Sequence, residues 1–163
     1  REWWWRIATL HIEAGRHEEA LDAVESLDLP SAGYLQIALR FADAGRYDLA
    51  LKLLDKATLA GASPDEIALF TSLFLQESAN DPLEGLAPLE RITPASPLYP
   101  SALQQRAHIL LQVGRFAEAL QRVKEGRKEF PDRKELWGLE AYTLFKLGKP
   151  EGAEKLLKAA FER

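Results

Sequence analysis

The three histidines have the widest chemical repertoire in this chain, because imidazole serves both as a base and as a metal ligand. His11 and His17 are six residues apart, whereas two ligands on one helix face are typically four apart. Glu13 and Glu18 lie nearby, but the histidine spacing argues against a metal site, and we expect none. His108 stands alone, and we interpret it as a polar contact residue rather than a catalytic base.

Other sequence signatures of catalysis are missing. The chain contains no cysteine, which excludes disulfides, thiolate catalysis and thiolate metal sites. It also lacks a nucleophile elbow, a phosphate-binding loop and a dinucleotide fingerprint. Paired carboxylates such as Asp65 and Glu66 fall in expected first helical turns, where capping explains them. We therefore predict a protein that is not an enzyme and that holds no cofactor or metal.

Charge is distributed unevenly along the chain. Residues 1–82 contain 7 Lys or Arg against 14 Asp or Glu, whereas residues 83–163 contain 14 against 11. This pattern argues against nucleic-acid binding, and it would permit head-to-tail self-association through the ends of the molecule. The basic run from Arg122 to Lys134 is interleaved with acidic residues, so we interpret it as solvated surface. No apolar run approaches the roughly 18 residues of a membrane span, so we predict no membrane insertion.

A repeated turn motif organises the chain. Four glycines are each followed by a basic residue and, five positions later, by alanine: Gly15, Gly45, Gly114 and Gly148. These glycines are 30, 69 and 34 residues apart, and Asn80 stands where the missing one would fall. A period near 34 indicates a repeat array. Apolar residues at helical spacing on both sides of each turn predict helix pairs, and glycine suits the left-handed conformation that ends a helix.

The pattern predicts ten helices, and the third repeat departs from it. The predicted ranges are 2–14, 17–27, 31–44, 47–60, 64–78, 82–92, 99–113, 116–129, 133–147 and 150–162. Ser63 and Glu66 form a capping box before the fifth helix. Gly85 and Pro88 fall inside the sixth, which we therefore expect to be kinked or split. The three prolines of residues 93–100 predict a stiff, extended connector at which the array bends.

The repeats resemble tetratricopeptide repeats. That family places a large residue eleven before the turn glycine, a small one seven before it and alanine five after it. The matching residues are Trp4, Ala8 and Ala20; Tyr34, Ala38 and Ala50; Leu103, Ala107 and Ala119; Trp137, Ala141 and Ala153. Arg106 and Glu140 depart from the pattern, because they stand where the family usually has leucine.

The resemblance implies an all-α, right-handed solenoid of about five helix-turn-helix pairs with a degenerate third repeat. The repeats form a single domain over residues 1–163, with boundaries of about 1–30, 31–63, 64–95, 99–131 and 132–163. The chain starts with arginine and contains no methionine, and apolar residues remain on its last predicted helix. We therefore expect it to be a fragment of a longer protein. Trp3 is expected to face outward, toward a preceding repeat or a partner chain.

In this family the first helix of each pair lines a concave groove. The resemblance maps the following groove residues onto this chain: Trp5, Ile12, Leu35, Leu39, Phe70, Phe74, His108, Leu111, Tyr142 and Phe145. Five further mapped positions carry small or polar residues: Thr9, Ala42, Glu77, Gln104 and Gly138. This largely apolar surface would suit an extended peptide or an amphipathic helix. Two alternatives are that these residues pack in the core, or that they bury a segment of the same protein. The basic and amide residues with which chaperone-binding members hold a C-terminal carboxylate are absent, which excludes that ligand.

The predicted function is a protein-interaction scaffold or adaptor that binds a peptide or helix of a partner protein. One alternative is a regulatory or sensor segment of a larger enzyme or transcription regulator. Another is an accessory protein of bacterial envelope assembly or secretion. The sequence does not identify the compartment; we favour the bacterial cytoplasm, with the periplasm as the alternative.

Overall fold

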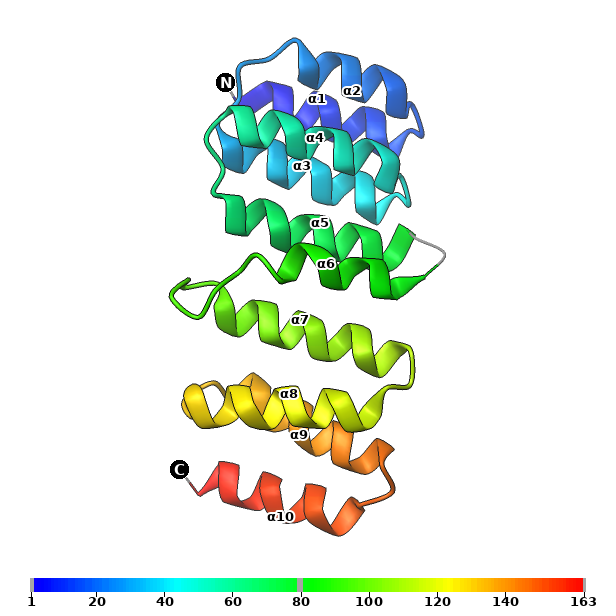
Figure 1. The fold of residues 1–163 in the computed structure, drawn as a ribbon. Helices are drawn as coiled ribbons and strands as arrows, with labels where there is room; N and C mark the ends of the chain where they lie inside the picture. The colour runs from blue at the N-terminus through cyan, green and yellow to red at the C-terminus, as the bar shows by residue number, and fades with distance from the viewer. Residues whose placement is uncertain (1, 79–80, 163) are drawn as a thin grey trace. The chain divides into compact units, whose positions relative to one another are not determined.

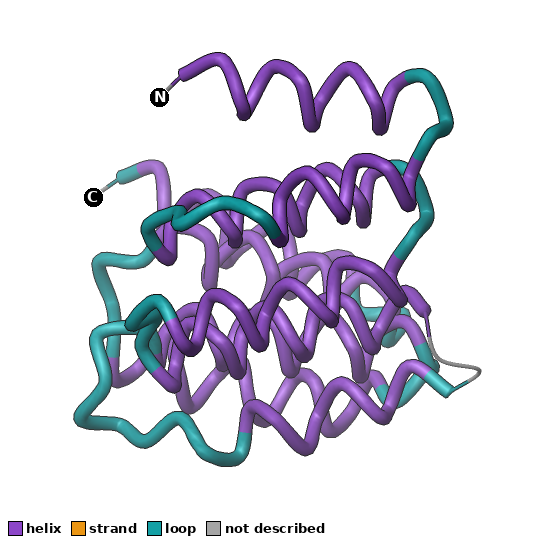
Figure 2. The backbone as a smooth tube through the Cα atoms, turned by 90° about the horizontal axis from the view of Figure 1, so that it is seen from above, coloured by secondary structure: helices purple, strands orange, loops and turns teal. Residues whose placement is uncertain are grey.

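The structure is a computed structural model that describes residues 2–78 and 81–162 (Figure 1). The chain divides into two compact units, Arg1–Asn80 and Asp81–Arg163. Both consist of helices and connecting turns, and no strand occurs in the described residues (Figure 2). Asn80, where the sequence lacks a turn glycine, lies outside the described residues.

The first unit contains two complete helix pairs and one further helix. The pairs are α1 (Glu2–Glu13) with α2 (His17–Glu25) and α3 (Ser31–Asp43) with α4 (Tyr47–Leu59), and α5 (Pro64–Ser78) follows. The members of each pair run antiparallel, and α3 packs on both α1 and α4 (Figure 1). One apolar core extends through these helices, from Ala8 in α1 to Phe74 in α5.

The second unit starts with a short irregular segment and continues with regular pairs. Its elements are η1 (Pro82–Gly85), α6 (Leu86–Leu89), α7 (Tyr99–Gln112), α8 (Phe116–Glu129), α9 (Lys134–Lys146) and α10 (Pro150–Phe161). Helix α8 packs on α7 and α9, and α9 packs on α10. At Gly126 of α8, a Cβ atom would lie 3.0 Å from Leu103 Cδ1, so α8 lies close to α7 there and an alanine would require the Leu103 side chain to shift by a few tenths of an ångström.

The turn glycines adopt the left-handed backbone conformation that the sequence predicts. Gly15 and Gly45 have φ of 73° and 74°, in the left-handed region that other residues rarely adopt. At the first turn, the Gly15 amide donates to Ile12 O and the Arg16 amide donates to His11 O, at 3.0 and 2.8 Å. These bonds satisfy carbonyls that the end of α1 would leave without partners. The chain can therefore reverse within three residues and start α2.

The degenerate third repeat agrees with the sequence in two respects and differs in one. The capping box forms, because the Ser63 amide donates to Glu66 and the Glu66 amide donates to Ser63 Oγ. The predicted helix 82–92 is split into the 3-10 helix η1 and the four-residue helix α6. The predicted extended connector over residues 93–100 is wrong. The chain forms successive turns there, with the Ser96 amide bonded to Thr93 O and the Tyr99 amide to Ser96 O.

The physical reason for this difference lies in Ser96 and Pro100. Ser96 Oγ accepts from the Leu98 amide at 3.2 Å, so its hydroxyl supports a turn rather than an extended backbone. Pro100 falls in the first turn of α7 and is buried. Proline is well tolerated at that position, because its missing N–H would have no partner inside the helix.

Glu140, a departure from the family pattern, has a partner that explains it. Its side chain is only 4% exposed and accepts a hydrogen bond from Arg127 Nε of α8. The Arg127 guanidinium also lies over the Trp137 ring, 4.5 Å from its centroid. The Trp137 indole N–H in turn donates to Pro131 O at 2.9 Å. Burial of the carboxylate is tolerated here because the guanidinium neutralises it, and the guanidinium is in turn stacked on the indole ring.

This pair makes the second unit sensitive to loss of one charge. We expect Arg127→Ala to lower the free energy of unfolding by about 3–5 kcal/mol, because it leaves the Glu140 carboxylate buried without a counter-ion. The double variant R127M/E140L removes both charges and should recover most of that loss. Urea unfolding followed by circular dichroism measures both. Equal destabilisation of the two variants would show that packing, rather than charge, is lost.

Candidate binding groove

The strongest candidate site lies between two adjacent first helices of the second unit. Helices α7 and α9 pack side by side and flank an open, shallow pocket of about 560 Å³. Its lining comes from both helices: Gln104, His108, Glu135, Gly138, Leu139 and Tyr142. His108 and Tyr142 belong to the groove set predicted from the sequence, so the structure brings these two residues together. The pocket is widely open to solvent, so a partner could contact both its polar and its apolar groups from outside.

Gly138 leaves the pocket open. No atom lies within 4 Å of the position that a Cβ would occupy there, and this glycine is in the interior of a helix. Glycine destabilises a helix interior by roughly 0.5–1 kcal/mol relative to alanine. The residue therefore costs helix stability at a place where local packing does not require it. Because glycine has no side chain, the space next to α9 at this position stays free.

The polar groups of the pocket differ in character. His108 is partly desolvated by its surroundings, and this lowers the pKa of its imidazole below the ordinary value of 6.5. The neutral ring then offers one donor and one acceptor near neutral pH. Gln104 adds an amide and Glu135 adds a carboxylate. Together they can pair with backbone or polar side-chain groups of a bound peptide.

Exposed aromatic residues extend the pocket along α9. Tyr142 is 50% exposed and Phe145 is 62% exposed. The Lys146 ammonium lies 5.4 Å from the centroid of the Tyr142 ring. Leu111 of α7, also in the predicted set, is half-buried and packs against the core cluster of Ala107, Val123 and Leu139.

Two pocket residues, Glu135 and Leu139, were absent from the predicted set. Glu135, Gly138, Leu139 and Tyr142 follow each other at helical spacings of three and four, so they share one face of α9. The two missed residues could have been found by extending the face defined by Gly138 and Tyr142 along the helix.

In the first unit, most of the predicted groove residues are less accessible. Ile12 and Leu35 are each 7% exposed and belong to the core, as the core-packing alternative predicts. Trp5 is half-buried against the same core, and the Arg40 guanidinium lies 5.6 Å from its ring centroid. Leu39, at 36% exposed, is the most accessible of these four predicted residues.

In the third repeat, the structure corrects the register. Phe74 is fully buried, so its side chain belongs to the core. The centroid of the Phe70 ring lies 5.9 Å from that of Phe74. Ser72 and Phe74, both 0% exposed, repeat a spacing found at Ala107 and Ile109 of α7. The small residue of this repeat is therefore Ser72, one position earlier than the turn spacing predicts. Leu73, 37% exposed, then takes the groove position expected for Phe74.

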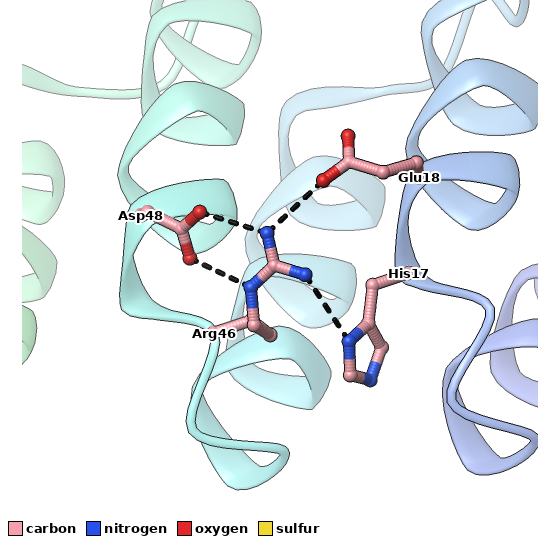
Figure 3. A network of polar contacts seen from close by, with 4 residues as sticks. All are labelled: His17, Glu18, Arg46 and Asp48. Atoms are coloured by element: carbon pink, nitrogen blue, oxygen red, sulfur yellow. Dashed lines mark hydrogen bonds and ion pairs between the residues drawn. The ribbon is translucent and has the colours of Figure 1, made fainter.

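A polar network joins the turns of the first two repeats (Figure 3). Arg46 donates to both oxygens of Asp48 at 3.0 and 2.8 Å, and to Glu18 Oε1 at 3.1 Å. Its third contact is to His17 Nδ1, at 3.2 Å. The arginine thus bridges the starts of α2 and α4 and holds the first two repeats together. No group of three or more His, Cys, Asp or Glu that could hold a metal occurs in the described residues.

Comparisons with known proteins agree with this architecture. Residues 110–163 match the tetratricopeptide repeat family model, which confirms the resemblance for this part of the chain. Solved structures of MamA share the fold along nearly the whole chain. MamA of AMB-1 is 20% identical with a TM-score of 0.62, covering 98% of this chain and 96% of that one.

Two further MamA structures give a similar result. MamA of MSR-1 is 22% identical with a TM-score of 0.60, covering 98% of this chain and 94% of that one. MamA from Desulfovibrio magneticus RS-1, residues 41 to the end, is 16% identical with a TM-score of 0.64, covering 99% and 93%. No curated protein sequence matches this chain significantly.

These findings confirm the predicted all-α fold of tetratricopeptide-like helix pairs with a degenerate third repeat. Folds of this type are suited to protein-interaction scaffolds, because stacked pairs create extended surfaces on which a partner can lie. None of the described helices combines the length and apolar character needed to cross a membrane.

The corrected register of α5 can be tested through stability. We expect Phe74→Ala to lower the free energy of unfolding by about 3–5 kcal/mol, since it leaves a cavity in the core of the first unit. Leu73→Ala should cost much less, because that side chain is partly solvated. Urea unfolding of both variants measures the difference. A larger loss for Leu73→Ala would restore the register predicted from the turn spacing.

The Arg46 network should make stability depend on pH. The hydrogen bond from Arg46 lowers the pKa of Asp48 below its ordinary 3.8. The pair therefore stabilises the fold above pH 3.8, and this contribution disappears as the pH falls through the lower pKa of the folded state. We expect Asp48→Asn to lower the thermal midpoint near neutral pH and to match the wild type in acid. Asp55→Asn, on the same helix but outside the network, is the control, and an equal effect of both variants would contradict the assignment.

Proposed function

We propose that this protein is a non-catalytic interaction scaffold that binds a peptide or an amphipathic helix of a partner protein in an apolar groove. The pocket between α7 and α9 carries the proposal. This pocket is lined by positions that the repeat pattern assigns to the groove. That assignment used only the distances from the turn glycines. The same positions are the ones that first helices of tetratricopeptide repeats turn toward their ligands.

The composition of the groove favours a peptide over a small polar metabolite. Tyr142 and Phe145 provide apolar contact area and remain substantially exposed without a ligand. Aromatic side chains of this kind are frequent anchors in protein interfaces, because they bury much area at a small entropic cost. Gln104 and the neutral His108 supply hydrogen bonds for the backbone of an extended or helical segment.

Gly138 provides a direct test of this function. Gly138→Leu should fill the groove, and it should leave the fold intact because leucine is a better helix former than glycine. Peptides are first selected on the full chain from a displayed random library. Their affinities for the wild type and the variant are then measured by fluorescence polarisation. We expect G138L to weaken binding by about tenfold or more, which is about 1.4 kcal/mol.

Gly152→Leu is the matched control. Gly152 lies in α10 and is exposed, and a Cβ there would meet only Leu144 Cδ1 at 3.8 Å. This variant makes the same chemical change outside the groove and should bind like the wild type. Failure to select any peptide, or equal binding by G138L and the wild type, would overturn the proposal.

A further inference from the structure

Among the described residues that line the pocket between α7 and α9, Glu135 is the one that is charged near neutral pH. The imidazole of His108 is mostly neutral there, because desolvation lowers its pKa. The Glu135 side chain is exposed, and no Lys or Arg in the described part of the chain forms an ion pair with it. The pocket therefore presents a negative charge that a ligand can neutralise.

The helix dipole does not by itself account for this acidic residue. Glu135 lies in the first turn of α9, where a negative charge is favourable. However, α3 and α7 are also first helices of their repeats, and neither has an acidic residue in its first turn. At the repeat position of Glu135, 34 residues earlier, α7 has Ser101. A first helix of this protein thus forms without a carboxylate at this place.

The surface of α9 next to Glu135 can accommodate a long side chain. Gly138 is three residues further on the same face of the helix, and no atom lies within 4 Å of the position that its Cβ would occupy. A ligand side chain can therefore pass over Gly138 and reach the carboxylate. Lysine and arginine fit this path, because an apolar stem carries their charged group.

Tyr142 provides a second contact on the same face. It follows Gly138 by four residues, which is about 6 Å along the helix axis. Its ring is 50% exposed, so an apolar ligand residue can pack on it. The Lys146 ammonium lies 5.4 Å from the centroid of this ring and would repel a basic residue at this end. The two ends of the pocket thus differ in the ligand charge that they favour.

We propose that the groove selects a peptide segment in which a lysine or arginine over Gly138 pairs with Glu135 and an apolar residue packs on Tyr142. The roughly 6 Å between the two contacts correspond to about two residues of an extended peptide or four of a helical one. The apolar contact supplies affinity, and the charge pair distinguishes basic from acidic segments. Because it concerns the same groove, this specificity rests on the proposed function.

The peptides selected on the full chain from the displayed random library are the probes for this specificity. We expect lysine or arginine to be enriched in them, two or four residues from an apolar residue. Replacing that basic residue by glutamate should weaken binding to the wild type by about fivefold or more, which is about 1 kcal/mol. Fluorescence polarisation measures both peptides, and high salt should reduce the difference because it screens exposed charges.

Charge reversal in the protein gives the decisive comparison. Glu135→Lys should bind the glutamate-substituted peptide more tightly than the original one, and Glu135→Gln should bind both about equally. Glu151→Lys is the matched control, because it makes the same change in the first turn of α10, outside the pocket, and should keep the wild-type preference. Circular dichroism verifies that all three variants are folded.

The outcomes separate this specificity from the proposed function. Selected peptides without a basic residue, peptides enriched in acidic residues, or an unchanged preference in E135K would overturn the assigned specificity and leave the groove as a binding site. Failure to select any peptide, or equal binding by G138L and the wild type, would overturn both.

Discussion

The two helices of each repeat can approach closely only where neither carries a bulky side chain at their crossing. Alanine is the small residue at this crossing on both helices. Ala8 and Ala20 in the first repeat are 1% and 0% exposed, and Ala38 and Ala50 in the second are both 0% exposed. The short distance between the backbones leaves larger residues such as Phe41 and Leu53 to fill the space toward neighbouring helices. One pair cannot bury those residues alone, so each repeat depends on the next one, and the exposed surfaces of first helices become the place where a partner can bind.

Most of the fold could be predicted from the sequence because the signals that define it are local. A glycine with positive φ, a capping box at Ser63 and apolar residues at helical spacing each act within one or two turns of helix. The predicted split at residues 82–92 had the same local origin in Gly85 and Pro88. The connector after it was predicted incorrectly, since proline composition alone does not show that the Ser96 hydroxyl supports a turn.

The candidate site was less predictable, because side-chain burial depends on neighbouring helices that no local pattern describes. Counting from turn glycines selected His108 and Tyr142, which line the pocket, but it placed Phe74 in the groove when this residue is in the core. Counting from the helix start gives the observed register only by comparison with α7: Ser72 is the ninth residue of α5, as Ala107 is the ninth of α7, whereas Ala38 is the eighth of α3. Ile12 and Leu35 were also assigned to the groove but lie in the core. Counting cannot separate the two cases, because groove and core residues of a first helix can both be apolar and lie at neighbouring positions.

The buried pair of Arg127 and Glu140 has a consequence for how this protein can change in evolution. Repeats with purely apolar contacts can be duplicated, deleted or exchanged at the cost of repacking alone, because no buried charge has to be matched. Helix α8 instead presents a guanidinium that must be matched by a carboxylate on the next helix, and α9 provides that carboxylate at a position where the other first helices have none. As long as both charges are present, the fourth and fifth repeats are therefore coupled. A recombination event that separated them would leave one charge buried in apolar surroundings, so this junction is expected to persist when neighbouring repeats are gained or lost.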